Sequence, residues 1–116
     1  MKTSMIKVET IYPKLETGWN LFYEKIYEPP VIYKNSFGEV RIEGLINGDW
    51  SKRILSLPPG FRPGKRHIFT VCGVGSTFVR VDVLENGDIF VSHDGKNGVN
   101  KTGWLALDGI AFYSKH

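Results

Sequence analysis

Scattered carboxylates and glycine-rich turns are the residues of this 116-residue chain that could perform chemistry. A glycosidase needs two carboxyl groups about 5 to 9 Å apart across a sugar cleft. The spacing of the acidic residues places no two of them in that way. We therefore expect no catalytic residue, and a cell-wall polysaccharide hydrolase is the weakest of three functional hypotheses. The carboxylates considered are Glu24, Glu28, Asp82, Glu85, Asp88 and Asp94.

Three glycine-containing segments have part of a cofactor or metal motif. Residues 60–66 resemble a phosphate loop, but a spacer residue is missing and Arg66 stands where a hydroxyl should bind Mg²⁺. Residues 73–78 have two glycines of a dinucleotide motif, with Phe78 in place of the third. Residues 94–98 lack the alternating carboxylates of a calcium loop. The lone Cys72 excludes an intramolecular disulfide and a cysteine-based zinc site. We expect neither a cofactor nor a metal.

The loop at residues 49–66 is the candidate contact surface. Its prolines lower the entropy lost on docking, its aromatic rings can fill pockets, and its cations can pair with carboxylates or with the phosphates of a cell-wall polymer. The alternative is that Leu57 and Phe61 pin the loop over one end of the fold while the cations stay solvated. The candidate contact residues are Trp50, Arg53, Phe61, Arg62, Lys65 and Arg66.

The same cations support a second hypothesis, a small β-barrel that binds single-stranded nucleic acid. A basic loop and abundant aromatic side chains are typical of such proteins. However, the aromatic residues of the predicted strands are not interleaved with the basic residues, and nearby acidic residues dilute the field. The net charge of +3 is too small to identify a polyanionic partner. Nucleic acid is therefore disfavoured as a partner.

Short strands must position these residues, because the sequence has frequent turn signals and no convincing helical period. The length suffices for one hydrophobic core, and 41% of the residues are hydrophobic. We expect an N-terminal arm at residues 1–16, with at most a short strand, and one domain at 17–116. No apolar stretch approaches the roughly 20 residues that span a bilayer, so no membrane partner is expected.

The predicted fold is all-β: an antiparallel, jelly-roll-like β-sandwich. Residues 30–35 and 39–46 form a hairpin, with Val40, Ile42 and Gly44 on one face and with Arg41 and Glu43 facing water. Strands are also expected at 67–73, 77–84 and 88–93. The last two are joined by a tight hairpin turn, for which Asn86-Gly87 supplies the positive φ angles. In the strand 77–84, the valines form one face, while Arg80 and Asp82 form the other. Residues 19–27 are predicted as a strand or irregular ribbon, and 94–103 as a polar loop.

The last predicted strand, residues 103–112, has apolar side chains on both faces, and Asp108-Gly109 supplies a bend where the alternation can change phase. A strand that buries both faces belongs inside a sandwich. This strand, the earlier Gly18-Trp19 and the loop Leu57-Pro58-Pro59-Gly60-Phe61-Arg62-Pro63 form a combined pattern.

This pattern resembles the small β-sandwich domains of tail-fibre and baseplate proteins of tailed bacteriophages. It is similar in particular to domains of siphophage receptor-binding proteins and to C-terminal modules of tail fibres. The resemblance covers residues 18–113. The matching residues are Gly18, Trp19, Gly38, Gly44, Leu57, Pro58, Gly60, Arg62, Pro63, Gly87, Trp104, Leu107, Asp108, Gly109 and Phe112.

The resemblance implies a noncatalytic virion protein, made in the host cytoplasm and assembled at the tail tip, with a structural or host-adsorption role. Its partners would be other tail or baseplate proteins and host cell-wall polysaccharide. It would form a homo-oligomer, a homotrimer about the tail axis, although these 116 residues include no collagen-like or heptad stem. For carbohydrate, exposed rings such as Trp50 or Tyr33 would stack on sugar faces, whereas Trp19 and Trp104 are expected in a core or interface.

Overall fold

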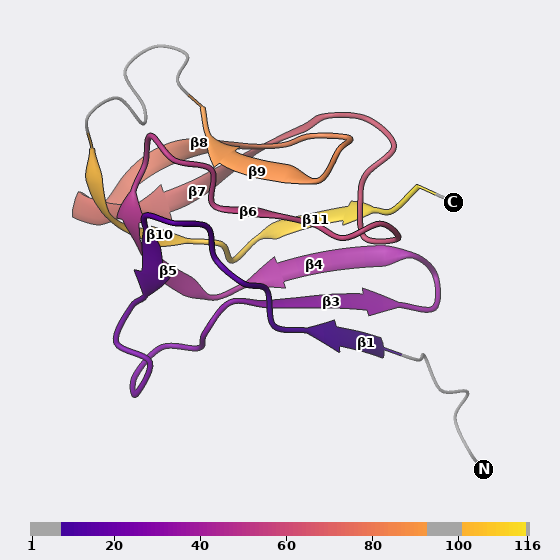
Figure 1. Ribbon diagram of the computed structural model, residues 1–116, viewed down its shortest axis with the longest axis horizontal. Helices are drawn as coiled ribbons and strands as arrows, with labels where there is room; N and C mark the ends of the chain where they lie inside the picture. Colours follow the sequence, from indigo (N-terminus) through magenta and orange to yellow (C-terminus); the bar gives the residue numbers. More distant parts are fainter. Residues whose placement is uncertain (1–7, 93–100, 116) are drawn as a thin grey trace.

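The computed structural model describes residues 8–92 and 101–115 of the chain. These residues form eleven strands and one short 3-10 turn, Val74–Ser76 (Figure 1). The strands are β1 (Val8–Ile11), β2 (Trp19–Leu21), β3 (Val31–Asn35), β4 (Glu39–Glu43), β5 (Leu45–Asp49), β6 (Leu55–Ser56), β7 (His67–Gly73), β8 (Thr77–Val83), β9 (Asp88–Val91), β10 (Thr102–Ala106) and β11 (Ile110–Tyr113).

The strands pair into two sheets that pack face to face, as Figure 1 shows. A small sheet has the order β1-β3-β4-β11, and a large sheet has the order β2-β5-β10-β7-β8-β9-β6. Every pairing between these strands is antiparallel. The predicted all-β antiparallel sandwich is therefore confirmed.

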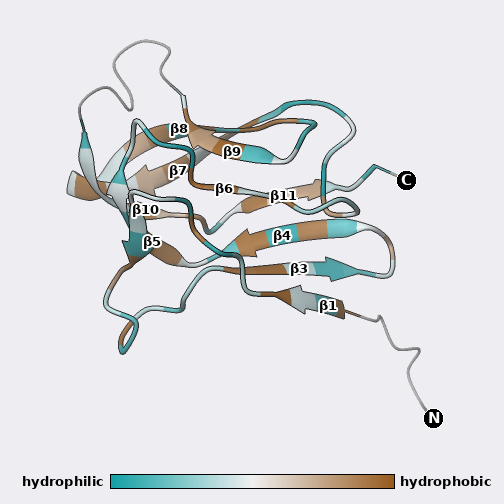
Figure 2. Ribbon diagram, viewed as in Figure 1, coloured by the Kyte–Doolittle hydropathy of each residue, from teal (hydrophilic) through white to brown (hydrophobic). Residues whose placement is uncertain are grey.

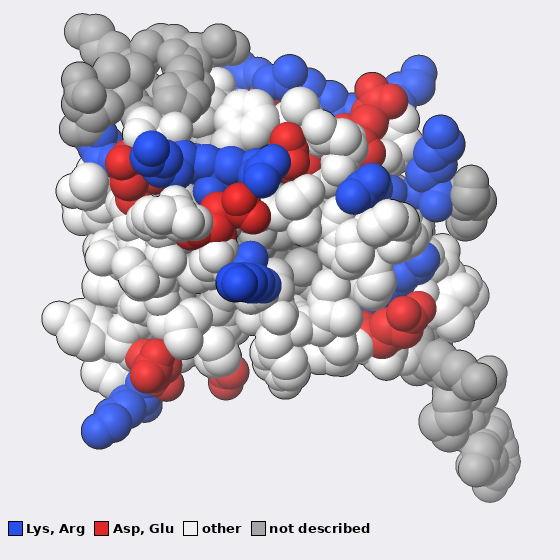
Figure 3. All heavy atoms as spheres, viewed as in Figure 1, with Lys and Arg blue, Asp and Glu red and all other residues white. Residues whose placement is uncertain are grey.

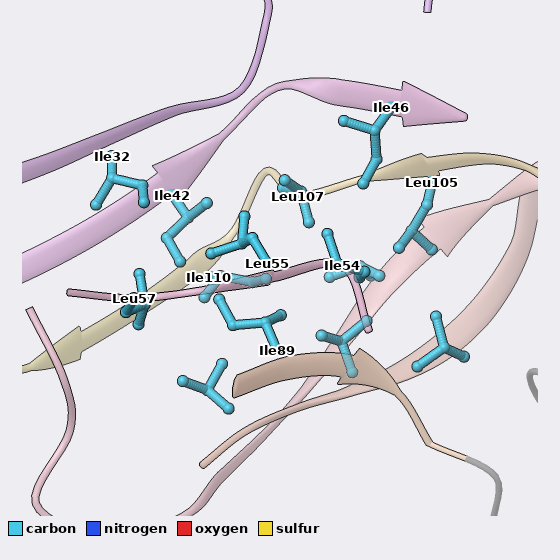
Figure 4. Packing of buried hydrophobic residues seen from close by; sticks show 14 of the residues in the cluster. Ile32, Ile42, Ile46, Ile54, Leu55, Leu57, Ile89, Leu105, Leu107 and Ile110 are labelled. Carbon is cyan, nitrogen blue, oxygen red and sulfur yellow. The ribbon is translucent and has the colours of Figure 1, made fainter. Parts of the chain in front are cut away.

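The core lies between the sheets and follows the alternation of side chains along each strand. Val79, Val81 and Val83 of β8 are at most 1% exposed, which confirms the inward face predicted for that strand. Figure 2 shows hydrophobic residues concentrated on the strands, and Figure 4 shows branched aliphatic side chains meeting between the layers. The fully buried aliphatic residues drawn there include Ile32, Ile42, Ile46, Ile54, Leu55, Leu57, Ile89, Leu105, Leu107 and Ile110.

Two segments predicted as single strands each change sheet partway along. The segment 39–46 becomes β4 in the small sheet and β5 in the large sheet, with Gly44 between them. The segment 103–112 becomes β10 in the large sheet and β11 in the small sheet, with Asp108-Gly109 at the change. Gly44 is buried like Val40 and Ile42, in keeping with the shared face predicted for them, but it belongs to neither strand and lies at this crossing with a φ of 126°.

Hydrogen bonds join the two crossings to each other. The Gly44 N–H donates to Asp108 Oδ1 at 2.8 Å, and the Leu107 N–H donates to the Gly44 carbonyl, also at 2.8 Å. A Cβ at position 44 would lie 2.6 Å from Pro30 Cα, so the backbone of the loop before β3 packs directly against Gly44. The two chain segments therefore pass between the sheets as one paired unit.

Several local predictions need correction or refinement. Of the segment 19–27, only β2 is a strand, and turns follow it. At the β8–β9 turn, Gly87 alone has a positive φ, 96°, whereas a two-residue turn would require one at Asn86 as well. The predicted loop at 49–66 contains the two-residue edge strand β6. The described part of the N-terminal arm includes β1, which pairs with β3.

The predicted polar loop at 94–103 lies mostly outside the described residues, as do Asp94 and His93. Within the described ranges, 8–92 and 101–115, no helix has the length and apolar character needed to cross a membrane.

Replacement of Asp108 by Ala is predicted to lower the free energy of unfolding by about 1–2 kcal/mol, because a partly buried N–H group of Gly44 loses its acceptor. Asp108→Asn keeps an oxygen at that position and is the matched control. Urea denaturation of both variants measures the difference. Equal stability of the Ala variant and the wild-type protein would contradict the structural role of this bond.

Candidate binding surface

The two rings predicted as contact residues lie in the core. Trp50 is 1% exposed, and its ring Nε1 donates to the Gly103 carbonyl at 3.2 Å. Phe61 is 7% exposed, and Lys34 Nζ lies 5.6 Å from its ring centroid. Neither ring can fill a pocket of a partner in this structure, and Trp50 cannot stack on a sugar. The expectation for these rings is corrected: they anchor the loop, as the alternative for Phe61 proposed.

The three predicted arginines are each held by a different acceptor. Arg53 lies 2.8 Å from Glu16 and 3.0 Å from Asp88, and these hydrogen-bonded carboxylates raise the pKa of its guanidinium. Arg62 Nε donates to the carbonyl of Leu57 at 2.8 Å. These contacts explain why positive and negative side chains are intermixed in the upper half of Figure 3, where β6 and β9 lie.

Arg66 binds Asp82, which is completely buried. Asp82 does lie on the outer face of β8, as its alternation with the buried valines requires. Arg66 and Arg80 cover it there, with Arg80 Nε 2.9 Å from Oδ1, and Arg66 also stacks over Phe90. Burial opposes ionisation of Asp82, but hydrogen bonds from Arg80 and Arg66 outweigh it and lower the pKa. Asp82 is thus an ionised structural group.

These contacts account for most of the predicted surface. Of the six candidate residues, two are core rings and three are arginines with defined acceptors within the chain. Lys65 is exposed, and the described residues give it no ion pair. The loop is therefore mainly a packed and internally neutralised part of the sandwich.

A different surface, the outer face of the small sheet, has polar groups and two tyrosine rings, one exposed and one half-buried. Because Val40 and Ile42 point into the core, Glu39, Arg41 and Glu43 of β4 point outward. Tyr33 of β3 is the register partner of Arg41, and Tyr113 of β11 is the partner of Glu39. The two tyrosines therefore flank the charged row of β4, on strands about 10 Å apart.

The polar groups of this face are linked to one another. Asn35 Nδ2 donates to Glu39 Oε1 at 3.3 Å, and Arg41 lies 3.6 Å from Glu43. Tyr33 and Val8 lie beside the polar side chains of β4 on the same surface, and Tyr113 is 66% exposed. Amide, carboxylate and guanidinium groups beside accessible aromatic rings can form both hydrogen bonds and stacking contacts with a polar ligand.

An open groove of about 460 Å³ runs along this face, lined by Val8, Tyr33, Asn35, Glu39, Arg41 and Glu43. Two smaller depressions adjoin it, because each shares Glu43 with it. One, of about 210 Å³, extends toward Gly109 and Ala111. The other, of about 420 Å³, extends to Ile26, Tyr27, Glu28 and Asp108. We call the three together the small-sheet groove.

The sequence identified part of this surface and missed the rest. Tyr33 was named as a possible stacking ring, and Arg41 and Glu43 were predicted to face water. Tyr113 was missed, although alternation from the buried Ile110 and Phe112 would have placed it outward. Tyr27 gave no periodic signal, because it follows a turn in which Tyr23 has a φ of 44°. Its ring stacks on Phe22 at 5.7 Å.

The described residues include no group of three or more metal-ligating side chains, and no buried side-chain polar atom among them lacks a hydrogen-bond partner. No protein-family model matches the sequence, and no curated protein matches it.

Replacement of Asp82 by Asn is predicted to reduce the free energy of unfolding by about 2 kcal/mol at pH 7, because two arginines lose their shared buried carboxylate. The pKa of Asp82 is lowered in the folded state, so its contribution is present above the unfolded value of 3.8 and is lost as the pH falls through the folded value.

Denaturation curves between pH 2 and about 7 measure this effect, and the loss of stability on acidification should be smaller in the Asn variant than in the wild-type protein. Glu16→Gln, which weakens the exposed pair with Arg53, is the control and should cost under about 1 kcal/mol. An Asp82 variant with unchanged stability and acid response would refute this account.

Proposed function

We propose that this chain is a noncatalytic module of a bacteriophage tail tip or baseplate that contributes to host adsorption by binding cell-wall polysaccharide. The observation that carries the proposal is the outer face of the small sheet, where Tyr33 lines the small-sheet groove and the exposed Tyr113 lies on the other side of the polar row of β4. Rings of this kind stack on the apolar faces of sugars, while carboxylates, amides and guanidinium groups bond to hydroxyls.

The residues that resemble tail-tip domains support a shared fold, because most of them have structural tasks here. Trp19 is 4% exposed, and its Nε1 donates to the Lys52 carbonyl. Pro63 forms an isolated β-bridge with Ser114, which joins the proline loop to the end of β11. Asp108 ties the two sheet crossings. Such positions constrain a sandwich and leave its outer faces free to vary between hosts.

The two other functional hypotheses have weaker support. A nucleic-acid surface needs cations free to contact phosphates, whereas Arg53 and Arg66 are bound to carboxylates. A hydrolase needs a general acid, and the lowered pKa of Asp82 makes that residue unsuitable. Adsorption without catalysis requires neither property.

Location in the virion implies neighbours on the tail. We propose that other tail or baseplate proteins bind surfaces away from the small-sheet groove, and that a homotrimer about the tail axis would present several grooves to the cell wall. Repetition of a weak site in this way increases the overall avidity.

Replacement of Tyr33 or Tyr113 by Ala should weaken binding to purified host cell walls about tenfold, since an aromatic contact at the centre of an interface contributes at least about 1–2 kcal/mol. Phe78→Ala is the matched control, because Phe78 is 83% exposed on the other sheet. Pull-down over a protein concentration series measures binding, and thermal unfolding verifies the fold of each variant.

Two results would overturn the proposal. One is cell-wall binding that survives in the Tyr33→Ala, Tyr113→Ala double variant. The other is release of sugars from the walls by the purified protein, with turnover that is lost on mutation of a carboxylate pair.

A further inference from the structure

The charge of the small-sheet groove differs from that of the whole chain. Its lining contains four carboxylates, Glu28, Glu39, Glu43 and Asp108, and one guanidinium, Arg41, a net charge of −3. The chain as a whole has a net charge of +3. The lining of the small-sheet groove is therefore net acidic although the chain as a whole is net basic.

The carboxylates of the groove differ in the hydrogen bonds and ion pairs that they already form within the protein. Asp108 accepts a bond from Gly44 through Oδ1, and Glu43 lies 3.6 Å from Arg41 with its side chain 39% exposed. Glu39 accepts one hydrogen bond, from Asn35. Each carboxylate has about four lone-pair sites, so these groups keep acceptor capacity toward the groove.

The tyrosine rings of the groove also favour a cationic ligand. Tyr33 lines the groove beside the β4 row, and Tyr27 lines its far end near Glu28. An ammonium group is attracted to the face of a tyrosine ring as well as to a carboxylate. A phosphate-bearing polymer would instead meet like charge along most of this surface.

We propose that the small-sheet groove selects saccharides with free amino groups and disfavours anionic glycopolymers. This inference rests on the proposed function and names the ligand class of the same site. Tyrosine faces support the sugar rings, while Glu39 and Glu43 pair with ammonium groups through exposed, charge-assisted hydrogen bonds. The cationic loop at 49–66 then has no direct part in selecting the sugar.

The test compares three soluble probes by titration calorimetry: a glucosamine oligosaccharide with free amines, the same oligosaccharide N-acetylated, and poly(glycerol phosphate). The first should bind severalfold more tightly than the second, with a ceiling of about 25-fold, since two exposed ion pairs contribute up to about fivefold each. The third should bind most weakly. The preference for the amine should fall in about 0.5 M salt, because interactions between exposed charges more than a few Å apart are then screened.

In a double variant, Glu39→Gln with Glu43→Gln, the preference for the free amine should be lost, so that the free-amine and N-acetylated probes bind with equal affinity. Glu85→Gln is the matched control, because Glu85 is exposed in the β8–β9 turn, away from the groove. The inference is overturned if the N-acetylated or the phosphate probe binds as tightly as the amine, or if the preference survives in the double variant.

The outcome for this inference is separable from that for the proposed function. If host cell walls bind through Tyr33 and Tyr113 but the free amine gives no advantage, the adsorption proposal stands and the charge selection is wrong. If the walls do not bind at all, the adsorption proposal fails, whatever the probes show.

Discussion

The sandwich depends on the place where two chain segments cross between its sheets side by side. β4 continues into β5, and β10 continues into β11, so each segment contributes a strand to both layers. Bonds from Gly44 to Asp108 and from Leu107 to Gly44 join them at the crossing. Because β5 pairs with β10 and β4 with β11, a slip of one segment would break the register in both sheets. One local contact therefore fixes the relation of the two layers.

The same crossing determines which side chains lie on the outer face of the small sheet. It sets the phase of β4, which turns Glu39, Arg41 and Glu43 outward, and the phase of β11, which exposes Tyr113. Asp108 has two roles here: one oxygen holds Gly44, and the residue also lines the groove. The rigid part of the fold and the surface proposed for ligand binding are therefore built from the same two segments, which limits how far the groove can deform on binding.

The sequence predicted what depends on local alternation and turn chemistry. The all-β sandwich, the inward valines of β8 and the hairpin of β3 and β4 follow from short-range patterns. The change of sheet was only partly visible: Asp108-Gly109 marked a bend, but partners from distant segments decide which sheet each half joins. Burial of Asp82 was also hidden, because it requires Arg66, 16 residues away, to fold across the outer face. Similarly, exposure of Trp50 and Phe61 could not be judged from a loop composition that suits either a core anchor or a contact ring.

The position of β10 has a consequence for how the protein is made. This strand is the tenth of the eleven described strands, yet it lies between β5 and β7 in the large sheet. Until it leaves the ribosome, β5 and β7 each have an unpaired edge, and β4 has no β11 beside it. Assembly of the sandwich must therefore wait for β10, with long loops closed in a late step. A chain interrupted before β10 would expose two sheet edges that can pair with other chains, so rapid folding once β10 is available matters more for this protein than for one whose strands pair in the order of synthesis.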